Sequence, residues 1–273
     1  MCTTCGCSNG ARARITDLAT SKLQRVGEHE PHGDFVRLHA HVHEPEPVQT
    51  HAHVHGTTVQ LEQDILAKNN RLAEQNREWL KAHNILALNL MSSPGAGKTT
   101  LLERTLRDLS SSLAISVVEG DQETLFDAER IRATGCPAVQ INTGTGCHLE
   151  AEMLAGALKQ LAPAPNSLVM VENVGNLVCP ALFDLGERAK VVILSVTEGA
   201  DKPLKYPHMF KASSLMIISK TDLLPYVDFD VSACIAFARR INPDIEVLQL
   251  SATQGEGLAD WYAWLRGQVS SER

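Results

Sequence analysis

The segment Ser92-Ser93-Pro94-Gly95-Ala96-Gly97-Lys98-Thr99-Thr100 gives the first indication of how this chain folds. It follows an apolar run, Ile85–Met91, of the length of a buried strand, and it opens a helical pattern at Leu101–Leu106. A strand, a glycine-rich loop and a helix in this order are the context of a phosphate-binding P-loop. Ser92 stands where the general pattern G-x-x-x-x-G-K-[ST] has its first glycine. The alternative is an ordinary glycine turn before a helix, which the complete strand–loop–helix context disfavours.

Each residue type in this loop suits the binding of a nucleotide. Glycines let the backbone turn so that several N–H groups point at one phosphate, and the start of the next helix adds its own N–H groups. Lys98 would reach the β- and γ-phosphates, and the Thr99 hydroxyl would bind Mg²⁺. The predicted nucleotide-binding residues of the loop are Gly95, Ala96, Gly97, Lys98, Thr99 and Thr100.

Composition restricts the class of protein. The chain of 273 residues is 44% hydrophobic, enough for a core, yet no apolar run approaches the roughly 20 residues of a membrane-spanning helix. An apolar secretory segment at the N-terminus is lacking too, so we expect a cytoplasmic protein without a membrane partner. A net charge of −7 argues against a nucleic-acid partner bound through a broad basic surface.

From residue 84 to 273, short apolar runs alternate with amphipathic patterns. This alternation predicts an α/β fold of the P-loop NTPase type, with a doubly wound, mostly parallel sheet and helices on both faces. Ligands of such sheets bind beyond the carboxyl ends of the strands, where the P-loop lies. The strands expected after the P-loop are Leu113–Val118, Ala138–Ile141, Ser167–Glu172, Val191–Val196, Leu215–Ser219 and Ile245–Gln249. The expected helices are Glu123–Ala133, Leu149–Leu161, Val231–Ile241 and one around Leu258–Leu265.

Cysteines crowd the N-terminus. Cys2, Cys5 and Cys7 lie within six residues, and removal of Met1 would add a free amine as a fourth donor. Seven cysteines, an odd number, in a chain that looks cytosolic favour metal ligands and buried thiols over disulfides. Three thiolates and an amine suit square-planar Ni²⁺ and can also hold tetrahedral Zn²⁺. The alternative is a cysteine-bearing tail that oxidises easily.

Residues 8–58 are polar and lack hydrophobic periodicity, so we expect a mobile linker. Within it, the segment His-Ala-His-Val-His at 39–43 recurs at 51–55. In an extended chain the three imidazoles of each copy lie on one side, which suits weak binding of several metal ions. The alternative is a solvated linker of low complexity. The predicted ligands in the repeat are His39, His41, His43, His51, His53 and His55.

Residues 59–83 have the periodicity of an amphipathic helix. We expect its apolar stripe to pack on the following domain rather than on a partner. The chain therefore divides into a Cys/His-rich metal-binding tail at 1–58, this helix at 59–83 and a P-loop domain at 84–273. The stripe consists of Leu61, Ile65, Leu72, Trp79 and Leu80.

Two acidic residues at strand ends are predicted to serve catalysis with Lys98. Asp121 follows the second strand of the domain, where a carboxylate can hold Mg²⁺ or its water. Glu172-Asn173-Val174-Gly175 resembles the D-x-x-G switch of GTPases, with Glu in place of Asp. The Glu172 carboxylate would meet the metal or the attacking water, and the Gly175 N–H could sense the γ-phosphate.

Two further segments point to guanine. Ser219-Lys220-Thr221-Asp222 resembles N-K-x-D, with Ser in place of Asn, and Ser251-Ala252-Thr253 resembles the S-A-K loop that touches guanine O6. A carboxylate at Asp222 can accept from guanine N1–H and N2–H together, whereas adenine offers no such donor pair. Asp222 alone would be an ordinary helix cap. The motifs together, in order at strand ends, predict GTP and GDP as the nucleotides, bound with Mg²⁺.

Soft ligands flank the Glu172 switch. Cys147 and His148 precede a predicted helix, and Cys179 lies seven residues after Glu172. They suit Ni²⁺ or Zn²⁺, and a switch that moves with the nucleotide would move Cys179 with it. The alternative is two buried thiols and a capping histidine, and the residues alone do not decide between the two.

These motifs together resemble the hydrogenase nickel-incorporation GTPases. The similarity rests on Met-Cys-Thr-Thr-Cys-Gly-Cys, the histidine repeat, the P-loop, Gly-Asp-Gln-Glu-Thr, Gly-Cys-His-Leu and Glu-Asn-Val-Gly-Asn-Leu-Val-Cys-Pro, and spans almost the whole chain. It implies a slow, regulatory cytoplasmic GTPase that helps insert Ni²⁺ into the large-subunit precursor of [NiFe]-hydrogenase, its nucleotide state gating metal transfer. It also implies a homodimer formed when GTP is bound and a small zinc- and nickel-binding maturation partner.

The resemblance also assigns ligands by motif. Cys2, Cys5 and Cys7 match the family's high-affinity nickel site. Cys147, His148 and Cys179 match its metal site in the GTPase domain, which takes Ni²⁺ or Zn²⁺ near the dimer interface. The alternatives are a urease nickel-delivery GTPase, disfavoured by the cysteine-rich start, and a nickel storage or buffer protein in which the histidine repeat does the main work.

Overall fold

The computed structural model describes residues 13–18, 23–25, 51–122 and 126–270, with the backbone alone at 23–25, 51–62 and 270. The strands in these segments are β1 (Arg14–Asp17), β2 (Leu23–Arg25), β3 (Leu86–Ser92), β4 (Ile115–Asp121), β5 (Ala138–Asn142), β6 (Leu168–Glu172), β7 (Ala189–Ser195), β8 (Leu215–Ser219) and β9 (Glu246–Gln249). The helices are α1 (His51–Ala82), α2 (Lys98–Leu109), α3 (Phe126–Arg132), α4 (Ala151–Leu161), α5 (Cys179–Leu182), α6 (Lys202–Lys205), α7 (Pro207–Ala212), α8 (Val231–Ile241) and α9 (Leu258–Ser270), with a 3₁₀ segment at Thr221–Tyr226.

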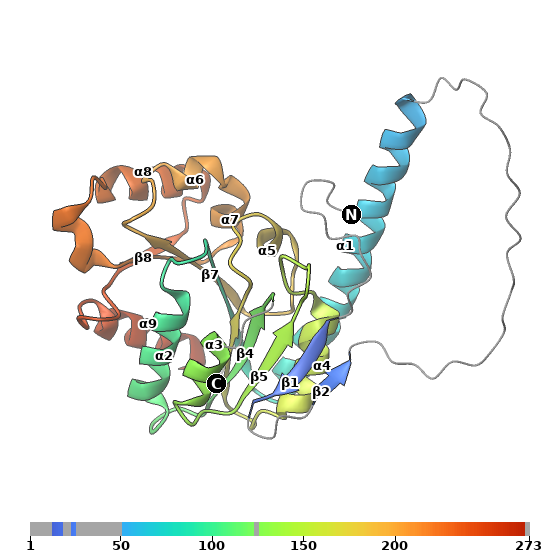
Figure 1. Ribbon diagram of the computed structural model, residues 1–273, viewed down its shortest axis with the longest axis horizontal. Helices are drawn as coiled ribbons and strands as arrows, with labels where there is room; N and C mark the ends of the chain where they lie inside the picture. The colour runs from blue at the N-terminus through green and yellow to red at the C-terminus, as the bar shows by residue number, and fades with distance from the viewer. Residues whose placement is uncertain (1–12, 19–22, 26–50, 123–125, 271–273) are drawn as a thin grey trace, which may run out of the picture.

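The strands of the described segments form one sheet in the order β2-β1-β5-β4-β6-β3-β7-β8-β9 (Figure 1). Strands β3 to β9 are parallel to one another, whereas β1 is antiparallel to both β5 and β2. The chain leaves β3 towards β4 and later returns to β7 on its other side, so β3 lies at the point where the strand order reverses. The predicted doubly wound, mostly parallel sheet is confirmed, and its ligand crevice lies at the end of β3.

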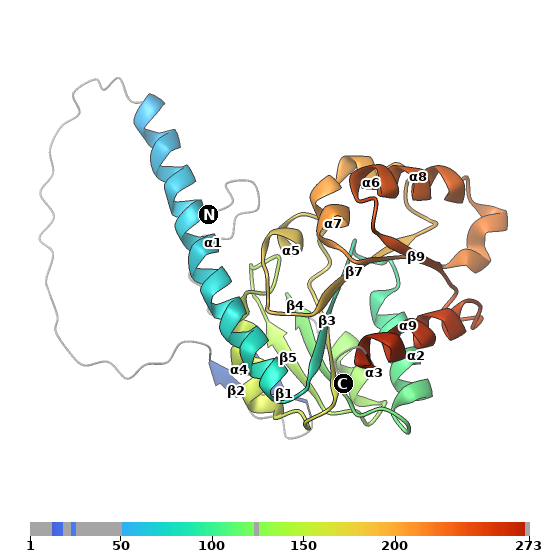
Figure 2. The same ribbon diagram turned by 180° about the vertical axis from the view of Figure 1, so that it is seen from behind.

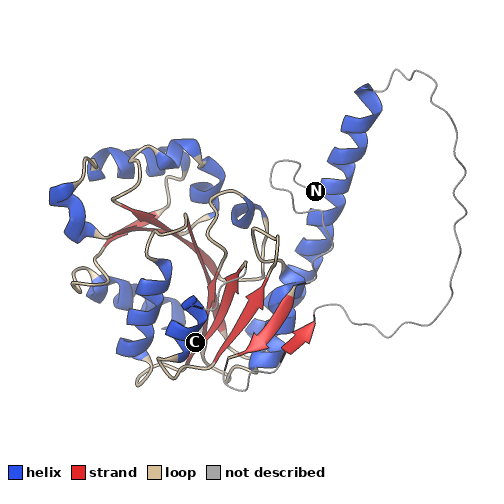
Figure 3. Ribbon diagram, in the orientation of Figure 1, coloured by secondary structure: helices blue, strands red, loops and turns tan. Residues whose placement is uncertain are grey.

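Helices cover both faces of the sheet, as predicted (Figures 2 and 3). Side chains alternate along β3: Leu88 and Leu90 pack under α2, α3 and α9, while Ala87 packs on the other face with α1 and α4. Met91, also on that other face, joins the cluster formed by α7 and α8. This period of two, buried on both sides, explains why the central strands are largely apolar on both faces.

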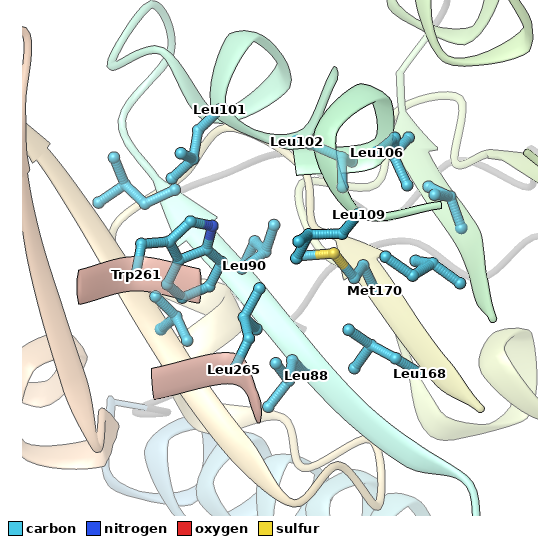
Figure 4. Close-up of a cluster of buried hydrophobic side chains, with 14 of the residues drawn as sticks. Leu88, Leu90, Leu101, Leu102, Leu106, Leu109, Leu168, Met170, Trp261 and Leu265 are labelled. Carbon is cyan, nitrogen blue, oxygen red and sulfur yellow. The ribbon is translucent and has the colours of Figure 1, made fainter. Parts of the chain in front are cut away.

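A large cluster of buried hydrophobic side chains lies between β3, β6, α2 and α9 (Figure 4). Trp261 of α9 is fully buried, and its indole N–H donates to the Thr105 hydroxyl of α2 at 2.9 Å. This bond satisfies the indole N–H, so the large aromatic side chain can be buried without an unpaired donor. The packing fixes α2, which carries the P-loop lysine at its start.

The N-terminal segment departs from prediction. Residues 14–17 were expected within a mobile linker, but they form β1, and Arg14–Asp17 pairs with Val139–Asn142 of β5. Ile15 and Leu18 are buried against the domain. The strand is too short to display periodicity, and its main partner lies more than a hundred residues away, so local pattern could not detect it.

The helix before the P-loop also differs from prediction. It begins at His51 rather than at residue 59, so the second histidine copy, expected to be extended, has a helical backbone. Its buried face consists of Asn69, Ala73, Asn76 and Leu80. Of the predicted stripe, Leu80 is buried, Ile65 and Leu72 are half-buried, and Trp79 is 37% exposed; the Leu61 side chain lies outside the described residues. Asn69 and Asn76 are polar, so a search for apolar periodicity does not place them on the buried face of the helix.

The expected elements of the domain otherwise appear within a few residues of their predicted bounds; residues 123–125 of the expected helix Glu123–Ala133 lie outside the described part. The short helices α5, α6 and α7 and the 3₁₀ segment were not predicted, because segments of four to six residues carry too little periodicity. None of the described helices has the length and apolarity needed to cross a membrane.

Candidate functional site

The P-loop turns through two glycines. Gly95 has φ +75° and Gly97 has φ +93°, left-handed values that favour glycine, and Gly97 is the residue from which α2 starts. Ser92 still belongs to β3 and does not have a positive φ, so its position does not require the glycine of the general pattern. The loop therefore presents backbone N–H groups and the N-terminus of a twelve-residue helix to one point.

The Glu172 carboxylate at the end of β6 is held by the P-loop. Its Oε1 accepts from Lys98 Nζ at 2.9 Å and from the Thr99 hydroxyl at 2.6 Å. Glu172 is 2% exposed, and its Oε2 is buried without a hydrogen-bond partner. An unpaired buried carboxylate oxygen costs free energy, so it fits a cation or a water molecule.

A cavity of about 430 Å³ opens beside this group. Gly175 lies against the P-loop, because a Cβ at this position would be 3.2 Å from atoms of Pro94. The structure thus brings the predicted switch residues to the predicted phosphate loop. Among the residues lining the cavity are Gly95 to Thr100, Asp121, Glu172, Gly175 and Lys220, all named from sequence, and Arg130 of α3, which was not.

Glu119 is an acidic residue of this cavity that sequence reasoning passed over in favour of Asp121. It is 2% exposed and pairs in register with Glu172 across β4 and β6, and its Oε2 has no hydrogen-bond partner. Burial first, and then the carboxylates of Glu172 and Asp121, raise the pKa of Glu119 to about 9. Its place directly after the apolar run Leu113–Val118, two residues before Asp121, was the signal that could have identified it.

A second cavity of about 180 Å³ collects the residues predicted to recognise guanine. It is lined by Asp222, Ser251 and Ala252, and it shares Gly97, Thr100 and Lys220 with the first cavity. Lys220 has φ +61°, and its Nζ donates to the Gly95 carbonyl at 2.7 Å. Ser219, which replaces the usual Asn, donates its hydroxyl to the Ala96 carbonyl at 2.6 Å. The segment 219–222 therefore supports the P-loop as well as the second cavity.

The cluster of Cys147, His148 and Cys179 also forms in space. Their ligand atoms lie within 4.8 Å of one another. Cys147 Sγ is 3.2 Å from Cys179 Sγ and 3.7 Å from His148 Nδ1. Cys147 and His148 come from the loop after β5, whereas Cys179 begins α5, so two separate segments must be held in place to form the cluster. Two sulfurs and an imidazole nitrogen are a donor set for Ni²⁺ or Zn²⁺.

The His148 ring is shielded from water. It lies 3.9 Å from the Phe183 ring between centroids, and burial lowers the pKa of His148 to about 4. The imidazole is therefore neutral at physiological pH, the form that binds metals. Its Nε2 is buried without a hydrogen-bond partner, 3.8 Å from Glu150 Oε1.

Asn173 joins the two sites and was not singled out from sequence. Its Oδ1 accepts from the backbone N–H of Leu149 at 3.2 Å and of Val174 at 2.9 Å. Its Nδ2 donates to Asn89 Oδ1 in the middle of β3 at 3.1 Å. Asn173 follows Glu172, and Leu149 follows His148, so one buried amide bonds the predicted switch segment to the loop that carries Cys147 and His148.

The side chains of the remaining predicted metal ligands are not described by the structure. Cys2, Cys5, Cys7, His39, His41 and His43 lie outside the described residues, and His51, His53 and His55 are described only by their helical backbone in α1.

Comparisons with known proteins agree on one family. A model of the CobW/HypB/UreG nucleotide-binding domain matches residues 86–249. The hydrogenase maturation factor HypB of Escherichia coli K12 is 49% identical over 291 aligned positions, which cover 98% of this chain and 99% of that protein. The hydrogenase maturation factor HypB of Azotobacter chroococcum is 51% identical, covering 98% of this chain and 92% of that one.

Solved structures give the same result. HypB from Archaeoglobus fulgidus is 41% identical with a TM-score of 0.70, covering 74% of this chain and 99% of that one. HypB from Helicobacter pylori, solved in complex with nickel, is 40% identical with a TM-score of 0.70, covering 75% of this chain and 96% of that one.

Proposed function

We propose that this chain, which belongs to the CobW/HypB/UreG family and within it to the hydrogenase maturation factors HypB, is a GTP-hydrolysing nickel metallochaperone. It would deliver Ni²⁺ to the large-subunit precursor of [NiFe]-hydrogenase, and the bound nucleotide would control when the metal is released. One observation carries the proposal furthest: the Asn173 amide bonds the Glu172 switch strand to the loop that holds Cys147 and His148.

The residues of the larger cavity suit slow hydrolysis of GTP. Lys98 would bind the β- and γ-phosphates together with the N–H groups of the loop. Thr99, Asp121 and Glu172 fit a Mg²⁺ ion, because the cavity combines a hydroxyl with buried carboxylate oxygens such as Glu172 Oε2 that lack a partner. When bound, Mg²⁺ would neutralise charge on the phosphates. Glu172 would orient the attacking water, and Gly175 would donate to the γ-phosphate.

Asp222 would make the site selective for guanine over adenine. Its carboxylate lies in the smaller cavity, where Ser251 and Ala252 supply the loop that would meet guanine O6. A carboxylate that accepts two hydrogen bonds from guanine is left unpaired by adenine, and this difference gives specificity.

Cys147, His148 and Cys179 would hold the metal cargo. Three ligands are one fewer than a closed structural zinc site has, which suits an ion that must leave again. The nucleotide can influence this set because a phosphate bound by Lys98 competes with Glu172 Oε1 for the ammonium group. Movement of Glu172 passes to Asn173, and from Asn173 to the Leu149 N–H beside His148.

The rest of the cycle follows the family resemblance. Cys2, Cys5 and Cys7 would acquire nickel, with the histidine repeat as a weak store, and the domain site, which also accepts Zn²⁺, would pass nickel on. We further propose a GTP-dependent homodimer, a small zinc- and nickel-binding maturation partner, and a cytoplasmic location.

A cell-based experiment tests this function. In a strain whose own copy is deleted, the nickel content of the hydrogenase large subunit is measured after expression of the parent or of Lys98→Ala. Loss of nickel insertion supports the proposal, and full insertion without GTP hydrolysis overturns the gating. Deletion of residues 29–55 under nickel limitation separates a storage role: normal maturation without them rules out storage as the main function.

Urease is the second candidate recipient. The Helicobacter pylori relative, 41% identical over 211 residues, is named a hydrogenase/urease maturation factor. Measuring urease nickel content in the same strains distinguishes the two recipients.

A further inference from the structure

Two buried asparagines on α1 bond to backbone groups of other segments. Asn69 Nδ2 donates to the Asp184 carbonyl at 2.7 Å, and Asn69 Oδ1 accepts from the Ala151 N–H at 2.9 Å. Asn76 Nδ2 donates to the carbonyls of Ala151 at 2.8 Å and Leu185 at 2.9 Å. The two asparagines are 4% and 5% exposed. Each therefore joins the same two pieces of chain.

Those two pieces carry the metal-binding residues. Ala151 lies three residues after His148, and Asp184 lies five residues after Cys179. The first piece follows β5 and the second follows β6, and the Cys147 and Cys179 sulfurs are 3.2 Å apart where the pieces meet. The asparagines thus bridge the two halves of the cluster from the side of α1.

Outer ion pairs repeat this bridging. Lys68 of α1 pairs with Glu152 at 3.2 Å, and Arg77 pairs with Asp184 at 2.6 Å. Both pairs are partly exposed and contribute little stability by themselves, but each joins α1 to one of the two pieces.

The close approach of α1 depends on a glycine. Gly186 has φ +89°, and a Cβ at this position would lie 2.4 Å from the Ala73 carbonyl oxygen and 2.8 Å from Asn76 Cβ. Only glycine lets the helix lie close enough for both asparagines to reach the backbone.

We propose that α1 is a clamp that sets the spacing between Cys147/His148 and Cys179, with Asn69 and Asn76 as positioning residues for the metal cargo. The inference rests on the proposed function, since it takes the cluster to be a metal site. Burying an amide side chain costs free energy unless its hydrogen bonds are made. The hydrogen bonds of Asn69 and Asn76 therefore favour one arrangement of the two pieces over others. Because α1 begins at His51, the clamp also ties the metal site to the segment of the histidine repeat.

Metal affinity tests the clamp. The full chain carrying Cys2→Ala, Cys5→Ala and Cys7→Ala is titrated with Ni²⁺ alone, followed by the thiolate-to-nickel absorption band, which the histidine repeat does not produce. Asn69→Ala and Asn76→Ala should weaken nickel binding about tenfold, as loss of groups that orient ligands does. Affinity for a fluorescent GDP analogue should stay within about twofold, because neither asparagine lines the nucleotide cavity.

Asn242 offers a matched control. Its Nδ2 also bridges two backbone carbonyls, those of Phe210 at 3.2 Å and Ser213 at 2.9 Å, and it touches neither site. Asn242→Ala should lower the melting temperature and leave nickel affinity unchanged. Nickel affinity that is unchanged in Asn69→Ala and Asn76→Ala, with only a lower melting temperature as in Asn242→Ala, would overturn the clamp.

A second measurement does not use metal. Diamide takes two electrons and two protons from a pair of thiols, forming a disulfide and reduced diamide, at a rate that depends on how often the sulfurs meet. Disulfide formation between Cys147 and Cys179 should slow several-fold in Asn69→Asp, which keeps the bond from Ala151 N–H but loses the one to Asp184, and in Gly186→Ala. Equal rates in the parent and both variants would contradict the clamp.

The outcomes separate the two proposals. A background protein whose nickel band is the same with and without Cys147→Ala/Cys179→Ala overturns the proposed metal site, and the clamp with it. A background protein that binds nickel at these cysteines, with clamp variants that bind it equally well, overturns the clamp alone.

Discussion

The Asn173 side-chain oxygen accepts a hydrogen bond from the backbone N–H of Leu149 at 3.2 Å, which joins the predicted switch segment to the loop that carries Cys147 and His148. Both residues are fully buried, and the opposite end of the same amide donates to Asn89. The bond gives the proposed nucleotide site and the proposed metal site a shared structural element. In the proposed mechanism, coupling of the two sites therefore needs no large rearrangement, because a shift of Glu172 acts through Asn173 on a bond beside His148.

Lys98→Ala removes the cation that holds Glu172 and, in the proposed mechanism, the transferred phosphate. We expect GTP hydrolysis to fall by about 100-fold or more, because electrostatic stabilisation of the transferred phosphoryl group is lost. Phosphate release in single-turnover reactions measures it. Lys159→Ala, an exposed lysine on α4, is the control and should hydrolyse GTP like the parent. A Lys98→Ala protein that keeps the parent's rate would exclude the P-loop lysine from the reaction.

Asp222→Asn should change the nucleotide preference rather than abolish binding. An amide in place of the carboxylate can no longer accept from both guanine donors, so GDP affinity should fall about 100-fold. The same amide can donate to the C2 carbonyl of xanthine, so XDP should bind better to the variant than to the parent. Competition titrations with GDP, ADP and XDP measure the change. An unchanged order of the three nucleotides would show that Asp222 does not contact the base.

Glu119→Gln should alter how stability depends on pH in the nucleotide-free, magnesium-free protein. Burial and the neighbouring Glu172 and Asp121 raise the pKa of Glu119 from 4.5 to about 9, so the native state keeps a proton that the unfolded chain loses. The shifted pKa of Glu119 leaves the free energy of unfolding unaffected below about pH 4.5. Between the two pKa values it lowers that free energy by up to about 1.4 kcal/mol per pH unit, and above the higher pKa it causes no further change.

Glutamine does not ionise, so the free energy of unfolding of Glu119→Gln does not show this decrease with pH. Its stability relative to the parent should therefore increase between about pH 5 and about pH 8. Urea unfolding of both proteins at the two pH values measures the difference. A constant difference in unfolding free energy across this range would show that Glu119 is already ionised in the native state.

The double variant Cys147→Ala/Cys179→Ala should lose one bound nickel per chain and the accompanying thiolate absorption. It should keep nucleotide binding, because these sulfurs do not line the nucleotide cavity. Metal content by elemental analysis, in the background without the N-terminal cysteines, checks it. Cys234→Ala is the control: this thiol is buried, and burial raises its pKa to about 12, so it stays protonated and should not bind metal. Equal nickel content in both proteins would return Cys147 and Cys179 to a structural role.

Sequence predicted most of the fold because the information is local in the P-loop domain. Glycine spacing, apolar runs of strand length and helical periodicity each lie within about a dozen residues, and parallel strands place their carboxyl ends at one edge. Asp121, Glu172 and Lys98 could therefore be expected around one cavity, and they line it. Cys147, His148 and Cys179 could be proposed as neighbours, and their ligand atoms lie close together.

What sequence could not predict depends on partners far apart in the chain. Residues 14–17 look like a linker until β5 provides the pairing edge. Asn69 and Asn76 look like the solvent face of a helix, yet they are buried because their amides meet backbone groups more than seventy residues away. Glu119 was overlooked because Asp121, at the strand end, suited metal binding better, whereas burial of a charged group can be seen only in three dimensions.

The release of nickel from the cluster of Cys147, His148 and Cys179 would show whether the bound nucleotide controls the metal. Protein lacking the N-terminal cysteines is loaded with one nickel per chain, and transfer to a chelator is followed after GTP–Mg²⁺ and, separately, after GDP–Mg²⁺. We expect the two nucleotides to give different rates in the parent and equal rates in Asn173→Ala, which loses the bonds to Leu149 and Asn89 but keeps the metal and nucleotide residues. Equal rates with both nucleotides in the parent would show that the nucleotide does not control nickel release, and a nucleotide dependence that survives in Asn173→Ala would show that Asn173 does not couple the two sites.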